Sequence, residues 1–325
     1  MIIDAQIHAN LFRLQSRSTW SMEMILDART HANGTAPAIA GEHDGIIRSA
    51  VTALDVVGID RAILDDFEGF LDHHYCPGQF AENGAWRADL SFSRRAVELF
   101  PERFRYLARV EPDDPDMSTL IAAPGATPGC AGLRFLYGPG LLWLDPKFAI
   151  GGYDEIFGLA SEHGVPVFLY VSGRVEAVVP YAKRFPKLSF VIDHTGVQFP
   201  VAGSTAERLA LLDPVVELAQ YDNIYLKWGH VEYLCAEPYP FATSMPGLRR
   251  VIDEFGANRV MWASDYTMAR RSDLFAAPPA PSYAQLLHYI ADSEALSADE
   301  KRWILGRTAA SLTKWPAEGD AAVRA

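Results

Sequence analysis

Titratable and polar side chains follow directly after short apolar segments of this sequence. The first segment, residues 1–8, alternates apolar and polar residues, which predicts a strand with Gln6 and His8 on one face and Asp4 behind them. Alternation alone also fits an edge strand with one wet face. Later apolar segments lead into His194, within Asp-His-Thr-Gly, and into Asp265, within Ser-Asp-Tyr. An imidazole and a carboxylate at such places can carry acid–base chemistry.

The sequence around these residues predicts strands that alternate with helices. Eight short apolar segments are separated by helical patterns, and the later ones recur every ~25–35 residues, the length of a βα unit. Near-continuous apolar strands are typical of a parallel sheet covered on both faces. Eight such units in 325 residues predict an α/β fold, a (β/α)8 TIM barrel. We expect one domain, residues 1–325, with a long loop at 9–41 and a helical C-terminal extension at 281–315.

In such a barrel the C-terminal ends of the strands meet at one mouth, where active sites lie. The strand ends supply a polar set of mixed charge: Gln6, His8, Asp65, Glu111, Arg134, Tyr170, His194, Lys227 and Asp265. Most of these also have a structural interpretation, as helix caps, a snorkelling cation, an ion-paired arginine or a core hydroxyl. Four further histidines are interpreted as solvated or core residues: His73, His74, His230 and His288.

Composition narrows the classes of partner. The net charge of −12 disfavours binding to the phosphates of a nucleic acid. The three cysteines, Cys76, Cys130 and Cys235, form neither a CxxC motif nor a disulfide framework, which suits a reducing compartment. No signal peptide or long apolar segment is evident. The sequence therefore predicts a cytoplasmic protein with a small-molecule substrate and no nucleic-acid or membrane partner; a homo-oligomer stays open.

Four short motifs, taken in order, resemble a known family. They are Ile3-Asp-Ala5, Gly132-Leu-Arg134, Asp193-His-Thr-Gly196 and Ser264-Asp-Tyr266. Together they resemble the family 2 branch of the amidohydrolase superfamily, from Ile2 to about Leu312. The resemblance implies a distorted (β/α)8 barrel, in agreement with the strand count.

The resemblance also indicates whether the site can bind a metal ion. Metal-dependent members of the branch take ligands from a His-x-His or Glu-x-His pair on the first strand, a histidine ending the fifth and an aspartate ending the eighth. Here Gln6 and Tyr170 stand where two of those ligands would be, and His8 and Asp265 remain. An amide oxygen is a weak zinc ligand. We therefore expect no intrinsic metal; the alternative is zinc or manganese held by His8, Asp265 and Gln6.

Some lactonases of the branch, the pyrone-dicarboxylate lactonases among them, work without a metal. They carry a tyrosine at the fifth-strand position and use the eighth-strand aspartate to activate water. The resemblance implies catalytic roles for Asp265, His194, His8 and Tyr170. It implies substrate binding by Arg134, with Lys227 where another basic contact is expected. The side-chain types add Gln6, Trp228 and Tyr266 as substrate-binding candidates. Six aromatic residues are expected around the mouth: Trp20, Phe70, Tyr75, Trp143, Trp228 and Tyr266.

Three hypotheses follow. The first is a metal-independent hydrolase of a lactone or ester from aromatic or sugar-acid catabolism. The second is a metal-dependent decarboxylase of an aromatic or unsaturated carboxylic acid. The third is a barrel that binds a ligand without catalysis. The pairing of His194 with Asp265 argues against the third, because binding alone does not require a base opposite an acid.

Overall fold

Eight parallel strands form a single sheet that closes almost completely into a barrel. The computed structural model describes residues 1–9, 42–66, 78–126, 129–136, 145–197, 203–235, 237–269 and 281–315. In the order in which they pair, the strands are β1 (Ile3–Ile7), β2 (Arg61–Leu64), β5 (Phe104–Ala108), β6 (Cys130–Phe135), β7 (Val167–Leu169), β8 (Phe190–Ile192), β9 (Ile224–Trp228) and β10 (Val260–Trp262). The predicted (β/α)8 TIM barrel is confirmed.

The first and eighth strands meet just beyond β10. The backbone N–H of Asp265 donates to the carbonyl oxygen of Gln6 at 3.1 Å, and the N–H of Ser264 donates to Asp4 Oδ1 at 2.9 Å. Because no strand ladder joins β1 to β10, these bonds link the two edges of the described sheet. The closing segment therefore also carries Asp265.

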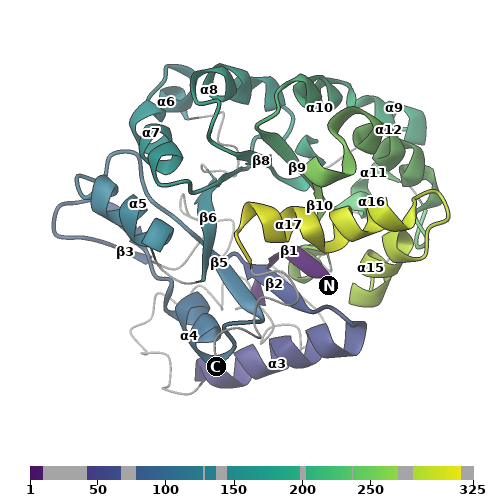
Figure 1. The fold of residues 1–325 in the computed structure, drawn as a ribbon, viewed down its shortest axis with the longest axis horizontal. Coiled ribbons are helices and arrows are strands. Elements are labelled where there is room, and N and C mark those ends of the chain that lie inside the picture. Colours follow the sequence, from purple (N-terminus) through teal and green to yellow (C-terminus); the bar gives the residue numbers. More distant parts are fainter. Residues whose placement is uncertain are drawn as a thin grey trace.

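Helices surround the strands (Figure 1). The larger set comprises α3 (Glu42–Val57), α4 (Ser91–Leu99), α5 (Met117–Ala126), α6 (Pro146–Ala149), α7 (Asp154–Glu162), α8 (Val179–Arg184), α9 (Thr205–Ala210), α10 (Asp213–Val216), α11 (Val231–Leu234), α12 (Met245–Phe255) and α13 (Tyr266–Ala269). The C-terminal segment adds α15 (Tyr283–Ala291), α16 (Ala298–Arg302), a π-helical turn at Trp303–Arg307 and α17 (Thr308–Leu312). A small antiparallel hairpin, β3 (Gly78–Phe80) with β4 (Trp86–Ala88), stands apart from the barrel sheet.

Local sequence sets several helix ends. Capping boxes begin three helices, in which a serine and the glutamate or glutamine three residues later satisfy each other's backbone N–H groups. Glycines in the left-handed region follow α7 and α12, at Gly164 and Gly256. The ends of these helices are therefore determined by capping residues close to them in the sequence.

Alternate residues of each strand enter two different cores. On β9, Ile224, Leu226 and Trp228 belong to the core between strands and helices, whereas Tyr225 packs against the core inside the barrel. That inner core includes Ile3, Ala5, Phe168 and Met261. The core between the strands and the helices is thus apolar, and the polar side chains that point inward lie inside the barrel.

The first strand departs from the predicted alternation. Asp4 accepts hydrogen bonds from Ser264 and from Tyr283 on α15, whereas Gln6 accepts one from Lys227 in the barrel interior. The β1–β2 register is irregular between Asp4 and Ile7. The expectation that Asp4 shares a face with Gln6 and His8 is therefore wrong, because an irregularity interrupts the period of two.

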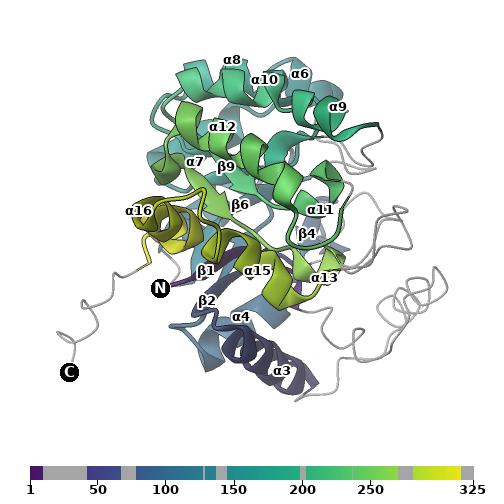
Figure 2. The same cartoon turned by 90° about the vertical axis from the view of Figure 1, so that its right-hand side faces the viewer.

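The last helices, α16 and α17, lie at the end of the barrel where the strands begin, whereas α15 begins beside α13. Trp315 is buried against the inner core, and the guanidinium groups of Arg61 and Arg105 lie 5.3 and 5.1 Å from its ring centre. Figure 2 shows α16 beside the N-terminus, with α13 on the opposite side of the molecule. The strand ends that carry the polar residues lie away from this C-terminal cover.

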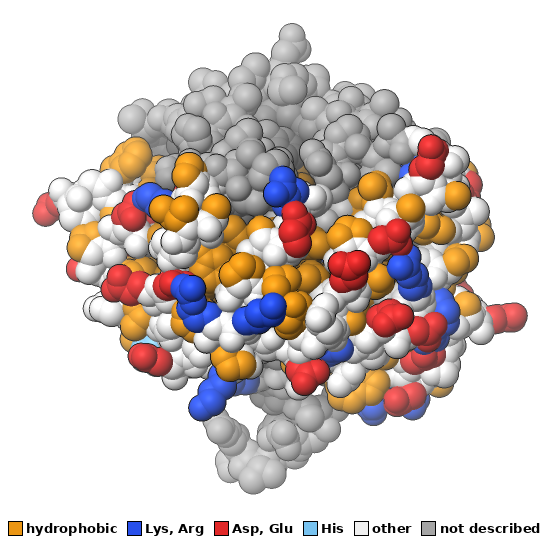
Figure 3. Space-filling model, turned by 90° about the horizontal axis from the view of Figure 1, so that it is seen from above, with side chains coloured by type: hydrophobic (Ala, Val, Ile, Leu, Met, Phe, Trp, Pro, Cys, Tyr) orange, Lys and Arg blue, Asp and Glu red, His pale blue; other side chains and the backbone are white. Residues whose placement is uncertain are grey.

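Acidic and basic side chains are interspersed with apolar ones on the face that Figure 3 shows. Among the described residues, no helix combines the length and apolar character needed to cross a bilayer.

Gly132 lies where β6 and β7 approach closely. A Cβ atom there would lie 2.5 Å from the carbonyl oxygen of Pro166 and 2.7 Å from the ring of Phe168. We expect Gly132→Ala to lower the free energy of unfolding by about 1–3 kcal/mol through overpacking, measured by urea denaturation.

Gly45 is the matched control, because it lies in α3 with no atom within 4 Å of an added Cβ. Gly45→Ala should raise stability by about 0.5–1 kcal/mol through helix propensity. Equal stabilities of the two variants would contradict the close approach of β6 and β7.

Candidate active site

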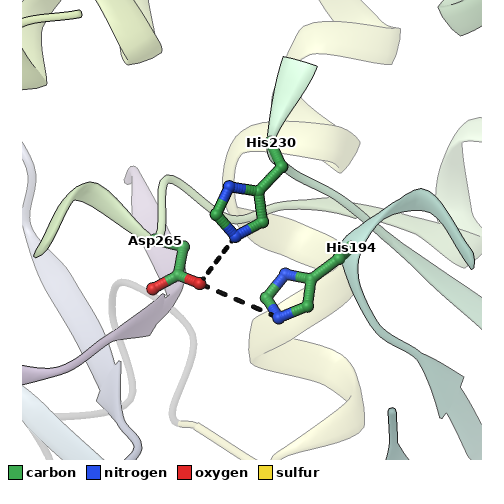
Figure 4. A group of neighbouring side chains, drawn as sticks. All are labelled: His194, His230 and Asp265. Carbon is green, nitrogen blue, oxygen red and sulfur yellow. Dashed lines mark hydrogen bonds and ion pairs between the residues drawn. The ribbon is translucent and has the colours of Figure 1, made fainter. Parts of the chain in front are cut away.

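The carboxylate of Asp265 is the centre of a buried cluster of imidazoles. Its Oδ1 lies 3.1 Å from His8 Nε2, and its Oδ2 lies 2.9 Å from His230 Nε2. His194 Nε2 lies 3.8 Å from the same Oδ2 (Figure 4). The three histidines come from the ends of β1, β8 and β9, and Asp265 follows β10. Four strand ends thus meet at one carboxylate.

Three of these four residues have an unusual backbone. His194, His230 and Asp265 have φ angles of 51°, 54° and 42°, in the left-handed region that non-glycine residues seldom adopt. Each follows a strand and directs its side chain toward the shared point. Such conformations persist where the surrounding structure enforces them, and they cluster at functional sites.

Each imidazole is oriented by a contact on its other side. His8 Nδ1 lies 2.5 Å from the carbonyl oxygen of Asp65, and His230 Nδ1 lies 2.9 Å from Glu232 Oε1. The ring of His194 packs edge-on against Tyr170, with 5.3 Å between ring centres. The predicted catalytic residues His8, Tyr170, His194 and Asp265 are therefore brought together, although their roles stay a prediction.

The cluster separates the charge states of its members. Burial raises the pKa of Asp265, but the charge of His8 and the hydrogen bond from His230 outweigh it and hold that pKa well below its usual range. Burial lowers the pKa of His230, but Glu232 and Asp265 outweigh it and raise the pKa to about 10. Burial and the charge of His230 depress the pKa of His194. Near neutral pH, Asp265 is an anion, His230 a cation and His194 a neutral imidazole.

A second layer of charge lies beside this cluster in the barrel interior. Arg134 donates from Nε to Asp65 Oδ2 at 3.1 Å and pairs with Asp193. Lys227 lies 2.5 Å from Asp193 Oδ1 and donates to the side-chain oxygen of Gln6. All five side chains are buried. These contacts favour the ion-pair interpretation of Arg134 and place Lys227 and Gln6 within the same network, instead of a substrate clamp open to the mouth.

The two aromatic residues predicted to bind substrate have other surroundings. Trp228 is fully buried in the core between strands and helices, so its predicted place at the mouth is wrong. The period of two explains this, because Lys227 faces inward and its neighbour must face outward. Tyr266 stacks on Tyr283 with 4.4 Å between ring centres, and its substrate-binding role stays a prediction. The remaining aromatics lie outside the described residues: Trp20, Phe70, Tyr75 and Trp143.

One group of side chains in the described part of the chain fits a divalent metal. Ligand atoms of His194, His230 and Asp265 all lie within 4.8 Å of one another, and all three residues are buried. Imidazole and carboxylate are ordinary ligands of zinc and manganese. This set shares Asp265 with the set expected from sequence but contains neither His8 nor Gln6. The amide oxygen of Gln6 already accepts from the Lys227 ammonium group, which makes it a poor ligand.

His230 is the site residue that sequence reasoning missed. The sequence predicts a solvated or core histidine at this position, whereas its side chain binds Asp265 directly. It follows the end of β9 by two residues. The sequence signal for it is a histidine two residues after an apolar strand, whereas the predicted site residue Lys227 lies inside that strand.

The fold and site define a parallel barrel with a carboxylate–imidazole centre at the C-terminal ends of its strands. The amidohydrolase family model matches residues 36–313, and the chain belongs to that family.

Individual relatives agree with this assignment. The chain is 33% identical over 107 residues to the L-fucono-1,5-lactonase of Burkholderia ambifaria; the match covers 30% of this chain and 33% of that protein. The match thus spans about a third of the length of this curated relative. The fold of the present chain is similar to that of a Pseudomonas putida protein described as a 2-pyrone-4,6-dicarboxylic acid hydrolase (TM-score 0.62, 19% identity, covering 96% and 97% of the two chains). A Burkholderia multivorans amidohydrolase with bound zinc is also similar (TM-score 0.61, 16% identity, 97% and 100%).

The place of Arg134 predicts a structural effect of its removal. Arg134→Met leaves the buried carboxylates of Asp65 and Asp193 short of a partner, so the free energy of unfolding should fall by about 3–5 kcal/mol. Urea denaturation measures this change. Arg302→Met is the control, because Arg302 pairs with Asp299 at the surface and should change stability far less. An Arg134→Met variant that keeps its stability and only has a raised KM would instead support a substrate-binding role for Arg134.

Proposed function

We propose that this amidohydrolase-family enzyme hydrolyses a lactone or ester, with water activated at Asp265. The observation that carries the proposal is the Asp265 carboxylate, held on both oxygens by His8 and His230 with neutral His194 beside it. Ester hydrolysis requires a base for water and a donor for the developing oxyanion. The local similarity to a lactonase supports a cyclic ester as the substrate.

The roles divide by charge state. Asp265 accepts a proton from water, because it is an anion in a site from which bulk water is largely excluded. His194, as a neutral imidazole, donates from one ring nitrogen to the carbonyl oxygen of the substrate. Tyr170, packed edge-on against His194, is the second candidate donor to the oxyanion. His8 and His230 fix the position of the carboxylate.

We further propose that the reaction does not need a metal. Binding of an ion by His194, His230 and Asp265 would have to replace the hydrogen bond between His230 Nε2 and Asp265 Oδ2. It would also have to remove a proton from His230, whose pKa is raised to about 10 by its two carboxylate neighbours. Protons and metals compete for such ligands. The His230 imidazolium already supplies positive charge at the carboxylate.

A metal-dependent enzyme is the second candidate, and the spacing of the ligand atoms favours it. His194, His230 and Asp265 would hold the ion, which would lower the pKa of a bound water as a Lewis acid. The same ligands suit the decarboxylase hypothesis. Metal content and substrate tests separate these candidates.

The first test is metal content. Protein purified without added ions should hold well under one equivalent of zinc or manganese by elemental analysis, and chelators should leave lactone hydrolysis intact. Near-stoichiometric metal, with activity lost to a chelator and restored by zinc, would move the assignment to the metal-dependent candidate. His230→Gln should then lose the metal, whereas the surface variant His288→Gln should keep it.

The second test concerns the role of Asp265 as the base. Asp265→Asn keeps the shape of the side chain but removes its basicity, so kcat should fall about 10²–10⁴-fold with little change in KM. The measurement is acid release from a panel of lactones and esters, with Asp292→Asn at the surface as control. Because the pKa of Asp265 is depressed, wild-type kcat should show no loss from its protonation until below about pH 4. Comparable turnover by Asp265→Asn would reject this role and direct the test to His194→Asn.

A further inference from the structure

A buried glutamate lies behind His230. Glu232 is the second residue of α11 and is 2% exposed. Its Oε1 lies 2.9 Å from His230 Nδ1, and its Oε2 has no hydrogen-bond partner among the described residues. Burial of a carboxylate is unfavourable unless it is paired and hydrogen-bonded. Here the pairing shown is with one imidazole, and that imidazole belongs to the site.

The two nitrogens of the His230 ring face two carboxylates. Nδ1 meets Glu232 and Nε2 meets Asp265 Oδ2, each at 2.9 Å. Figure 4 shows the ring of His230 directed at Asp265, beside the ring of His194. A ring rotation that broke the contact with Glu232 would also take Nε2 away from Asp265. The contact at Nδ1 therefore determines where Nε2 points.

His230 lies between the end of β9 and the start of α11 and has a φ of 54°, and its ring centre is 4.6 Å from that of His194. The Glu232 carboxylate, two residues along the chain, contacts Nδ1 of this ring.

We propose that Glu232 is a positioning residue of the active site, which holds the His230 ring so that its Nε2 stays on the Asp265 carboxylate. The proposal rests on the proposed function for its kinetic consequence, since Asp265 is the base there. Its structural content, the orientation of one ring, does not depend on which substrate is hydrolysed.

Three variants test the proposal. Glu232→Leu removes the acceptor, and kcat should fall about 10–100-fold with KM changed less than about twofold, as for other residues that orient a site group. Glu232→Gln keeps an acceptor oxygen at the same place and should stay within about threefold of wild type. Glu237→Leu is the control, because Glu237 lies on the same segment but accepts its hydrogen bonds from Thr243.

A second readout does not require turnover. In protein with nitrogen-15-labelled histidine, the His230 Nδ1–H should give a slowly exchanging signal, assigned by its absence from His230→Gln. The signal should persist in Glu232→Gln and Glu237→Leu and disappear in Glu232→Leu, with melting temperatures confirming that each variant is folded.

Several results would overturn the proposal: a Glu232→Leu enzyme that keeps both its kcat and the His230 signal, a Glu232→Gln enzyme that loses as much as Glu232→Leu, or a Glu237→Leu enzyme that loses the same. If the wild type hydrolyses no lactone or ester, the proposed function fails, and the NMR comparison alone decides the role of Glu232.

Discussion

Closure of the barrel and assembly of the site meet at one residue. The backbone N–H of Asp265 joins the eighth strand to the first at Gln6, while its side chain binds His8 from that first strand and His230 from the seventh. A buried carboxylate is tolerated only with such partners. The pairing therefore stabilises the closed end of the sheet and, in the same contacts, fixes the group proposed to activate water. A change that disturbs the closure of the barrel at Asp265 would therefore also disturb the site.

The interior of the barrel is arranged in two layers of charge. In one, Asp65 and Asp193 neutralise Arg134 and Lys227, with Arg109 also bound to Asp65 at 2.7 Å. In the other, Asp265 pairs with His8 and His230, Glu232 pairs with His230, and the pKa of His194 is depressed. Because the first layer is paired internally, we expect the chemistry to take place at the second. The loops that follow β1, β2, β6, β8 and β10 include residues outside those described.

Sequence predicted the barrel because its strands are short, apolar and regularly spaced, and these are local properties. It also placed His8, His194 and Asp265 together, because strand ends of a parallel barrel share one mouth. It misplaced Asp4, since the irregularity in β1 depends on pairing with β2. It misplaced Trp228, because the inward position on β9 belongs to Lys227. It overlooked His230 and Glu232, whose importance comes from contacts with each other and with Asp265, which no local pattern records.

We infer that His8 and His230 hold Asp265 as an anion at the point where we propose that water is activated. The most direct measurement is the titration of the Asp265 carboxyl carbon by carbon-13 NMR, assigned by comparison with Asp265→Asn. We expect an ionised carboxylate with no titration step of its own above about pH 4, the ordinary range for aspartate. A step at or above about pH 5 would show that burial outweighs the two imidazoles, and it would contradict this role of His8 and His230.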